Sequence, residues 1–521
     1  MSLVQAATVT ASPASNRVRA LKLFLSHILI ALFFFNVWTV GYPGRIVYLA
    51  KALVEHRTFS MRSYVGNPVF EQYAVMDTME FNGRLLNPHN PGTSLLATLG
   101  VWVYESTLSP VLEDNLLLDY YLLSVFAGLT STVVLYAASV ACIYLVLRSG
   151  LRSERRAMFF TLVYSLCTPV FFYASRNCED SLITSLFVLS FGLLFSARRT
   201  NPKHQPWLLG LSGLCIGYAC LSKMPAFIGV PVFCFLFVSG RYYRCPDTRR
   251  TKWCLALFVV GLIIPIVGLL AYHWRVYGAP LVNPIAIYAK LRFIPEDPYT
   301  LYGSLRALAQ CLSDLRCYTY YTIEPDYGVF INSPVLLLGP IGFLVSRLVK
   351  KNIRGNSPYD CSVVSKQEQL SMALIVLAYF AWQTSLITYV TSPEFGSRYA
   401  LPSLPFLVIL AALYSQHVSR LVSVFLASVS GLFAYCSTLL GTGNSFLAFK
   451  VLYPVTYFGL KGPFSPLLRA LLEASNVDVQ DISGLGATAL LLFLLAIIWV
   501  SEITNKFSAT PSNPGTWVDS P

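Results

Sequence analysis

Polar side chains that suit acid–base chemistry and anion binding are scattered through a chain that is otherwise strongly apolar. A carboxylate can take a proton from a hydroxyl group, and basic or hydroxyl side chains can hold an oxyanion. The candidates are the acids Asp77, Glu80, Glu179, Asp180 and Glu394, with His89, Lys223, Arg275, Arg398 and Tyr399. If the fold brings them to one place, they predict an acid–base site beside an anion site.

Each candidate also has a plainer structural interpretation. Arg398 is placed to form an interfacial ion pair with the acid four residues before it. Lys223 suits snorkelling toward lipid headgroups. Glu179 and Asp180 suit the first turn of a helix, where a carboxylate opposes the helix dipole. Asp77 suits an ordinary solvated position in a long loop. No single residue decides between the two interpretations.

The composition shows what kind of fold must position these residues. The chain has 521 residues, of which 55% are hydrophobic and only 12% charged, and its mean hydropathy is +0.58. Soluble domains carry roughly a quarter charged residues, and disordered chains lack a 14% aromatic content. The sequence therefore predicts an all-α polytopic membrane protein, because lipid offers backbone groups no partner outside their own helix.

Apolar runs of about the length that spans a bilayer, roughly 20 residues, recur along nearly the whole chain. They predict about twelve transmembrane helices, at 23–41, 121–147, 157–175, 181–197, 206–222, 224–240, 253–272, 327–346, 370–390, 401–416, 421–440 and 485–501. Residues 1–22 and 502–521 are then tails, the latter disordered, and 23–501 form a single transmembrane domain.

The basic residues indicate an orientation. Connections at 148–156, 198–203, 241–252 and 347–354 are rich in arginine and lysine, whereas those at 176–180 and 391–400 hold one base each. The positive-inside rule makes the basic set cytoplasmic, so we expect both termini inside. The formal charge of +13 is then an orientation signal, with no bearing on nucleic acid.

The long connections at 42–92, 273–326 and 441–484 face outward under this topology, as do the candidate residues. The apolar stretch 93–109 does not fit as a further crossing. We interpret it as a re-entrant piece or half-helix on the outer side, with a miscounted crossing as the alternative. Cys311 and Cys317 share an outer loop and would be able to form a disulfide in an oxidising compartment.

The stretch DTMEFNGRLLNPHNPGTSLLA at 77–97 resembles the first outer loop of GT-C membrane glycosyltransferases. It is most similar to the bacterial branch related to protein O-mannosyltransferases and the lipid A aminoarabinose transferase, whose loops read D-x-A-x-x-N-G-x-x-Y-x-x-K-x-P-G-x-S-L-L-A. The stretches at 277–280, 327–334 and 396–402 add weaker similarity in the same order. The resemblance implies a GT-C-like bundle and an enzyme of the cell envelope, in the bacterial plasma membrane.

Such an enzyme moves a sugar from a polyprenyl-phosphate donor to a lipid, glycan or protein acceptor on the outer face, with inversion. One carboxylate deprotonates the acceptor while cations hold the leaving phosphate. The family's usual acid after the first span is missing here, so the base role passes to Asp77, with Glu80 as a fallback. Asp180 or Glu179 would orient the acceptor or the neighbours of Asp77.

The family's lysine in the loop motif is also missing, and His89 stands near its place. Phosphate binding would fall to Arg398, Lys223, Arg275 or His89, with Glu394 and Tyr399 beside them. Some members use a divalent cation and others do not, so the resemblance leaves a metal open. A polytopic secondary transporter is the alternative function, and a non-catalytic envelope scaffold is a third.

Overall fold

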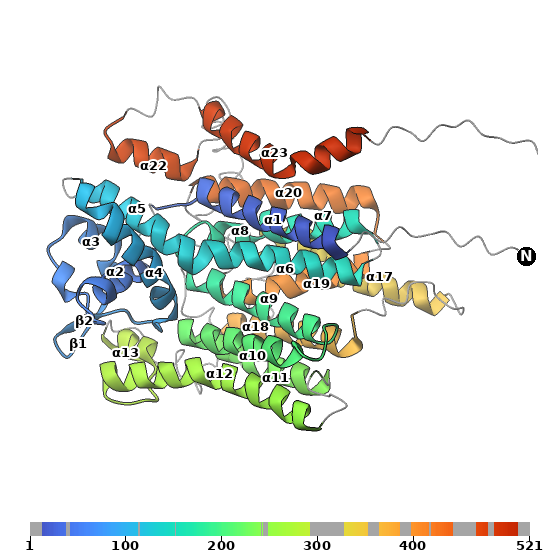
Figure 1. Ribbon diagram of the computed structural model, residues 1–521, viewed down its shortest axis with the longest axis horizontal. Coiled ribbons are helices and arrows are strands. Elements are labelled where there is room, and N and C mark those ends of the chain that lie inside the picture. Colours follow the sequence, from blue (N-terminus) through green and yellow to red (C-terminus); the bar gives the residue numbers. More distant parts are fainter. Residues whose placement is uncertain are drawn as a thin grey trace, which may run out of the picture.

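The computed structural model describes residues 13–37, 42–112, 115–151, 153–240, 242, 248–291, 328–352, 364–385, 398–415, 418–440, 465–477 and 484–508. Most of this chain is helical (Figure 1). The helices are α1 (Pro13–Phe33), α2 (Tyr42–Glu55), α3 (Pro68–Tyr73), α4 (Gly92–Thr107), α5 (Leu116–Gly128), α6 (Val134–Gly150), α7 (Glu154–Leu166), α8 (Pro169–Ala174), α9 (Glu179–Ala197), α10 (Gln205–Ser222), α11 (Gly229–Ser239), α12 (Thr248–Tyr277), α13 (Pro284–Leu291), α16 (Val329–Asn332), α17 (Leu338–Asn352), α18 (Lys366–Ser385), α19 (Leu404–Tyr414), α20 (Arg420–Leu440), α22 (Pro466–Ala474) and α23 (Gly484–Ser508). The predicted all-α membrane fold is confirmed.

Among the residues that the structure describes, four helical segments are long and apolar enough to cross a membrane. They are Leu116–Gly150, Glu179–Ala197, Thr248–Tyr277 and Arg420–Leu439. Shorter apolar helices cover Met224–Ser239, Pro334–Val345, Arg398–Tyr414 and Thr488–Val500. The 30-residue helix α12 leaves large side chains such as Ile264 (60% exposed) and Val267 (54%) on the surface. An apolar face of this size suits lipid and would be costly in water.

Several predicted boundaries change for local reasons. The helix α1 begins at Pro13, ten residues before the predicted first span, so the predicted tail of residues 1–22 is partly helical. The predicted span 157–175 is divided into α7 and α8, because Thr168 caps a new helix whose first residue is Pro169. At the other end of the chain, α23 continues to Ser508, past the predicted boundary at 501.

The first long connection, 42–92, is folded around its own helices and one hairpin. The strands β1 (Met79–Phe81) and β2 (Arg84–Leu86) are antiparallel and are joined by Asn82 and Gly83, both at positive φ. Figure 1 shows α2, α3, α4 and this hairpin gathered at one end of the bundle, on the left. The predicted half-helix at 93–109 is α4, which at 16 residues is about 24 Å long, shorter than a typical hydrocarbon core.

The opposite end of the bundle collects the basic connections. Arg19 at the start of α1 pairs with Glu154 at the start of α7 and, at 3.0 Å, with Glu502 near the end of α23. Arg198 after α9 lies 3.7 Å from Glu368 on α18. We call this the basic end, and the end that carries α2, α4 and the hairpin the loop end.

The helices α10 and α12 pack without side chains between them at two points. A Cβ on Gly213 would lie 2.1 Å from the carbonyl oxygen of Phe258, and one on Gly261 would lie 2.2 Å from that of Gly210. Only glycine permits this approach. The contact fixes α10, whose last residue directly precedes Lys223.

Candidate active site

A single buried arginine joins two of the predicted acids at the loop end. Arg45 on α2 forms ion pairs with Asp77 and with Glu179, the latter at 2.8 Å between Nη2 and Oε1. The side chains of Arg45 and Glu179 are each 2% exposed, whereas that of Asp77 is 37% exposed. The guanidinium therefore connects an acid of the long loop to an acid of the bundle, and it leaves Asp77 accessible.

A second buried pair lies one residue further along α9. Lys223 Nζ is 2.6 Å from Asp180 Oδ2, and both side chains are 3% exposed. The ammonium group also faces the ring of Tyr399, 5.2 Å from its centroid. Lys223 therefore does not snorkel to headgroups, and Asp180 does more than cap a helix.

Arg398 and Tyr399 enter the same region from the short helix η8 (Arg398–Ser403). Arg398 Nη2 donates to the Tyr399 hydroxyl at 3.0 Å, and its guanidinium lies 4.9 Å from the centroid of that ring. The predicted ion pair of Arg398 with Glu394 involves residues 391–397, which lie outside the described chain, as do Cys311 and Cys317.

His89 is half-buried among these cations. Burial lowers its pKa well below the usual value, and the positive charges of Arg45, Lys223 and Arg398 lower it further. Its Nδ1 atom has no hydrogen-bond partner within the described parts of the chain. His89 is thus a neutral imidazole that can donate or accept one hydrogen bond.

Two predicted residues lie apart from this cluster. Glu80 is on the outer hairpin, where it pairs with Arg62 at 2.7 Å, and both side chains are largely exposed. Arg275 is exposed near the end of α12. The structure thus brings together Asp77, Glu179, Asp180, His89, Lys223, Arg398 and Tyr399, and it leaves Glu80 and Arg275 outside.

Sequence reasoning missed Arg45. The stretch that contains Arg45 lacks the carboxylate expected from the resemblance. An arginine beside Ile46, Val47 and Leu49 is nevertheless the same kind of signal as Lys223 between two apolar runs. A lone charge in an apolar helix calls for a buried partner. Arg45 has such a partner in Glu179, and it also pairs with the more exposed Asp77.

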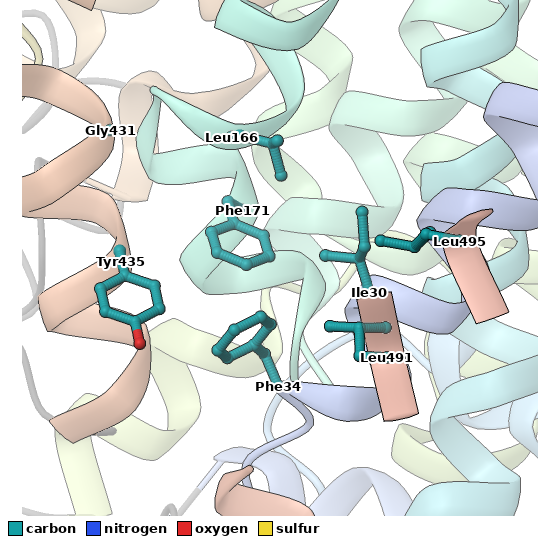
Figure 2. A pocket seen from close by; sticks show the side chains of 8 residues that line it. All are labelled: Ile30, Phe34, Leu166, Phe171, Gly431, Tyr435, Leu491 and Leu495. Carbon is teal, nitrogen blue, oxygen red and sulfur yellow. The ribbon is translucent and has the colours of Figure 1, made fainter. Parts of the chain in front are cut away.

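Within the described residues, no group of three or more histidine, cysteine, aspartate or glutamate side chains has the arrangement of a metal site. A separate cavity of about 250 Å³ lies between α1, α8, α20 and α23. Figure 2 shows its lining, which is apolar except for the hydroxyl group of Tyr435. The residues that line this cavity include no acid–base pair, in contrast to the cluster at the loop end.

The sequence of one segment matches a known family. Residues 111–268, less than a third of the chain, match the model described as dolichyl-phosphate-mannose-protein mannosyltransferase. The chain is a membrane glycosyltransferase. This confirms the predicted class of enzyme, which takes its sugar from a lipid-phosphate donor. The matched segment of the glycosyltransferase includes Glu179, Asp180 and Lys223, whereas Asp77 and Arg398 lie outside it.

Solved structures show distant similarity to the glycosyltransferase. ArnT from Cupriavidus metallidurans bound to undecaprenyl phosphate is 14% identical, with a TM-score of 0.47, over 96% of this chain and 82% of that one. The archaeal oligosaccharyltransferase AglB from Archaeoglobus fulgidus is 15% identical, with a TM-score of 0.41, over 88% of this chain and 56% of that one. Among curated protein sequences, none matches the chain.

Proposed function

We propose that this glycosyltransferase moves a sugar from a polyprenyl-phosphate donor to an acceptor hydroxyl group at the loop end, with inversion at the anomeric carbon. The observation that carries the proposal is the cluster around Arg45. It holds three carboxylates close to three cations, and Asp77 is the only one of the three carboxylates with substantial exposure.

Asp77 is the general base in this proposal. An acceptor must approach from water or from the membrane surface, and the side chains of Glu179 and Asp180, at 2% and 3% exposed, are closed to it. Glu80 is accessible, but it lies on the hairpin beside Arg62 and outside the cation cluster. Glu179 acts through Arg45, whose guanidinium fixes the position of Asp77.

The reaction balances with these groups alone. Asp77 accepts the proton of the acceptor hydroxyl group while the acceptor oxygen bonds to the anomeric carbon from the face opposite the phosphate. The bond between that carbon and the phosphate oxygen breaks, and polyprenyl phosphate leaves. Lys223 and Arg398 stabilise the charge that develops on the leaving phosphate, and neutral His89 supplies a hydrogen bond to it.

The proposed orientation places the loop end on the outer face of the plasma membrane and the basic end in the cytoplasm. It rests on the positive-inside rule and on the gathering of Arg19, Arg198 and their partners at the end opposite the cluster. Both termini are then cytoplasmic, since α1 begins and α23 ends at the basic end.

The test is Asp77→Asn, which keeps the shape of the side chain and removes its charge. We expect transfer from a polyprenyl-phosphate sugar to fall by about 10²- to 10⁴-fold, the usual contribution of a general base. Glu71→Gln, an exposed acid of the same loop, is the matched control and should keep the wild-type rate. Near wild-type transfer by Asp77→Asn, with loss in Glu80→Gln, would assign the base to Glu80 instead.

The donor and acceptor can be identified in cells. Mass spectrometry of envelope glycans and lipid carriers, with and without the protein, should show a glycosylated carrier that accumulates and a sugar that disappears from its acceptor. Vesicles that take up a solute through this protein without any lipid-linked donor would support a transporter instead.

A further inference from the structure

The helix α4 begins inside the protein without a capping group. Its N-cap residue is Pro91, whose side chain makes no capping hydrogen bond, and the first backbone bond runs from Leu95 N–H to Pro91 O. The N–H groups of Gly92, Thr93 and Ser94 come before that bond, and no acceptor contacts them within the described chain. A buried helix end without partners is costly unless a ligand satisfies it.

Two hydroxyl groups of the same turn also lack a partner among the residues that the structure describes. Thr93 and Ser94 are each 1% exposed, and within this part of the chain neither Oγ1 of Thr93 nor Oγ of Ser94 has a hydrogen-bond partner. Side chains of a helix tilt toward its N-terminus, so these hydroxyl groups of the first turn lie at the same helix end as the free N–H groups. Buried hydroxyl groups are normally hydrogen-bonded. This second observation therefore also points to a ligand.

The N-terminus of α4 lies against the end of α10, beside Lys223. A Cβ on Gly92 would lie 2.5 Å from Oγ and 2.7 Å from the nitrogen of Ser222, the residue before Lys223. Asn90 Nδ2 donates to Cys220 O at 2.8 Å, and the Tyr218 hydroxyl donates to Gly92 O at 2.8 Å. These contacts hold the helix end within the cation cluster that surrounds His89.

The helix end adds positive potential that the ion pairs of the cluster do not offset. Lys223 is paired with Asp180, and Arg45 is paired with both Asp77 and Glu179, so part of the positive charge of these cations is already balanced. A helix N-terminus offers N–H groups and the positive end of its dipole to an anion. Its charge is not offset by any carboxylate that contacts α4's first turn among the described residues.

We propose that the N-terminus of α4 is the phosphate-binding element of the donor site, with the Thr93 and Ser94 hydroxyl groups as its side-chain donors. This proposal rests on the proposed function, since the phosphate is that of the polyprenyl carrier. Gly92 is required because any side chain there would collide with Ser222. Lys223 and Arg398 then surround the phosphate.

The experiment measures binding of polyprenyl phosphate to the full-length protein in nanodiscs, with polyprenol as the matched ligand without phosphate. Thr93→Val keeps the size of the side chain and removes its hydroxyl group, and Ser94→Ala removes the other. Each should weaken polyprenyl phosphate binding about tenfold, the effect of one lost hydrogen bond to a charged group, and leave polyprenol binding unchanged. Thr98→Val on the same helix is the control, because the Thr98 hydroxyl already donates to Leu95 O at 2.6 Å.

A conservative variant separates ligand contact from folding. Thr93→Ser restores a hydroxyl group and should bind polyprenyl phosphate as the wild type does. Two results would overturn the phosphate site: an equal loss of polyprenyl phosphate affinity in Thr93→Ser and Thr93→Val, or wild-type affinity in the Thr93→Val Ser94→Ala double variant. In either case, sugar transfer by the wild-type protein would still support the proposed function. A wild-type protein that neither transfers sugar nor distinguishes polyprenyl phosphate from polyprenol would instead overturn the proposed function.

Discussion

Ion pairs occupy both ends of the helical bundle, but they differ in their access to water. At the basic end, Arg19 is 19% exposed and its partners Glu154 and Glu502 are 33% and 25% exposed. At the loop end, the pairs Arg45–Glu179 and Lys223–Asp180 are at most 3% exposed. Exposed pairs contribute little to stability, and buried ones are costly to assemble.

This difference in the exposure of the ion pairs indicates which end of the bundle suits a functional site. The basic end joins α1, α7 and α23 with pairs that water can partly screen, as expected for residues that orient a chain in the membrane. The loop end takes four charges out of water, beside polar atoms that have no partner in the described chain. Stability alone gives no reason for that arrangement, whereas binding a charged substrate does.

The largest effect on this contrast should come from breaking a buried pair. Lys223→Met leaves Asp180 as an uncompensated buried charge, and we expect the free energy of unfolding to fall by about 3–5 kcal/mol. Thermal unfolding in detergent would measure this. Adding Asp180→Asn to the same protein should recover part of the loss. If the single and double variants unfold alike, the two side chains do not act as a pair.

A smaller effect concerns pH and His89. Burial and the surrounding cations lower the pKa of His89 well below its usual value, so the folded state binds the proton more weakly than the unfolded state. The stability that His89 contributes is therefore complete above its unfolded pKa of about 6.5 and is lost as the pH falls below it. Unfolding curves between pH 7.5 and 5 should be flatter for His89→Gln than for the wild type. Parallel curves would show that His89 is not held neutral.

The smallest effect should come from the basic end. Arg19→Met removes the contacts with Glu154 and Glu502, yet these side chains remain partly hydrated. We expect a loss of about 1 kcal/mol or less, with transfer activity unchanged. A loss as large as that of Lys223→Met would remove the distinction between the two ends.

The fold class could be predicted from the sequence, and so could the gathering of most candidate residues at one end of the bundle. Twenty-residue apolar runs and alternating basic loops are physical requirements of a bilayer, so they are legible without a structure. Lys223 and Glu179 stood out for the same reason, as charges next to apolar helices. A charge that is buried beside apolar helices needs a partner of opposite charge.

The partners themselves could not be predicted, because pairing depends on how distant segments pack. Arg45 and Glu179 are 134 residues apart, and nothing in either stretch specifies the other. Asp77 and Glu80 are three residues apart and both carry a carboxylate, but the hairpin directs Glu80 outward to Arg62, whereas Asp77 pairs with Arg45. The division of the predicted span 157–175 at Thr168 also could not be predicted, because the apolar run in the sequence is continuous there.

The glycine contacts between α10 and α12 have a consequence for how damage spreads through this protein. Where backbone meets backbone, no rotamer can adjust to absorb an added methyl group. Replacing Gly213 by alanine would have to separate two long helices. The end of α10 would move with them, and it carries Ser222, against which Gly92 packs, and is followed by Lys223. The spacing of the proposed donor site would then depend on glycines within the bundle that lie outside that site. Substitutions at these glycines would lower transfer activity without changing any proposed substrate-binding residue.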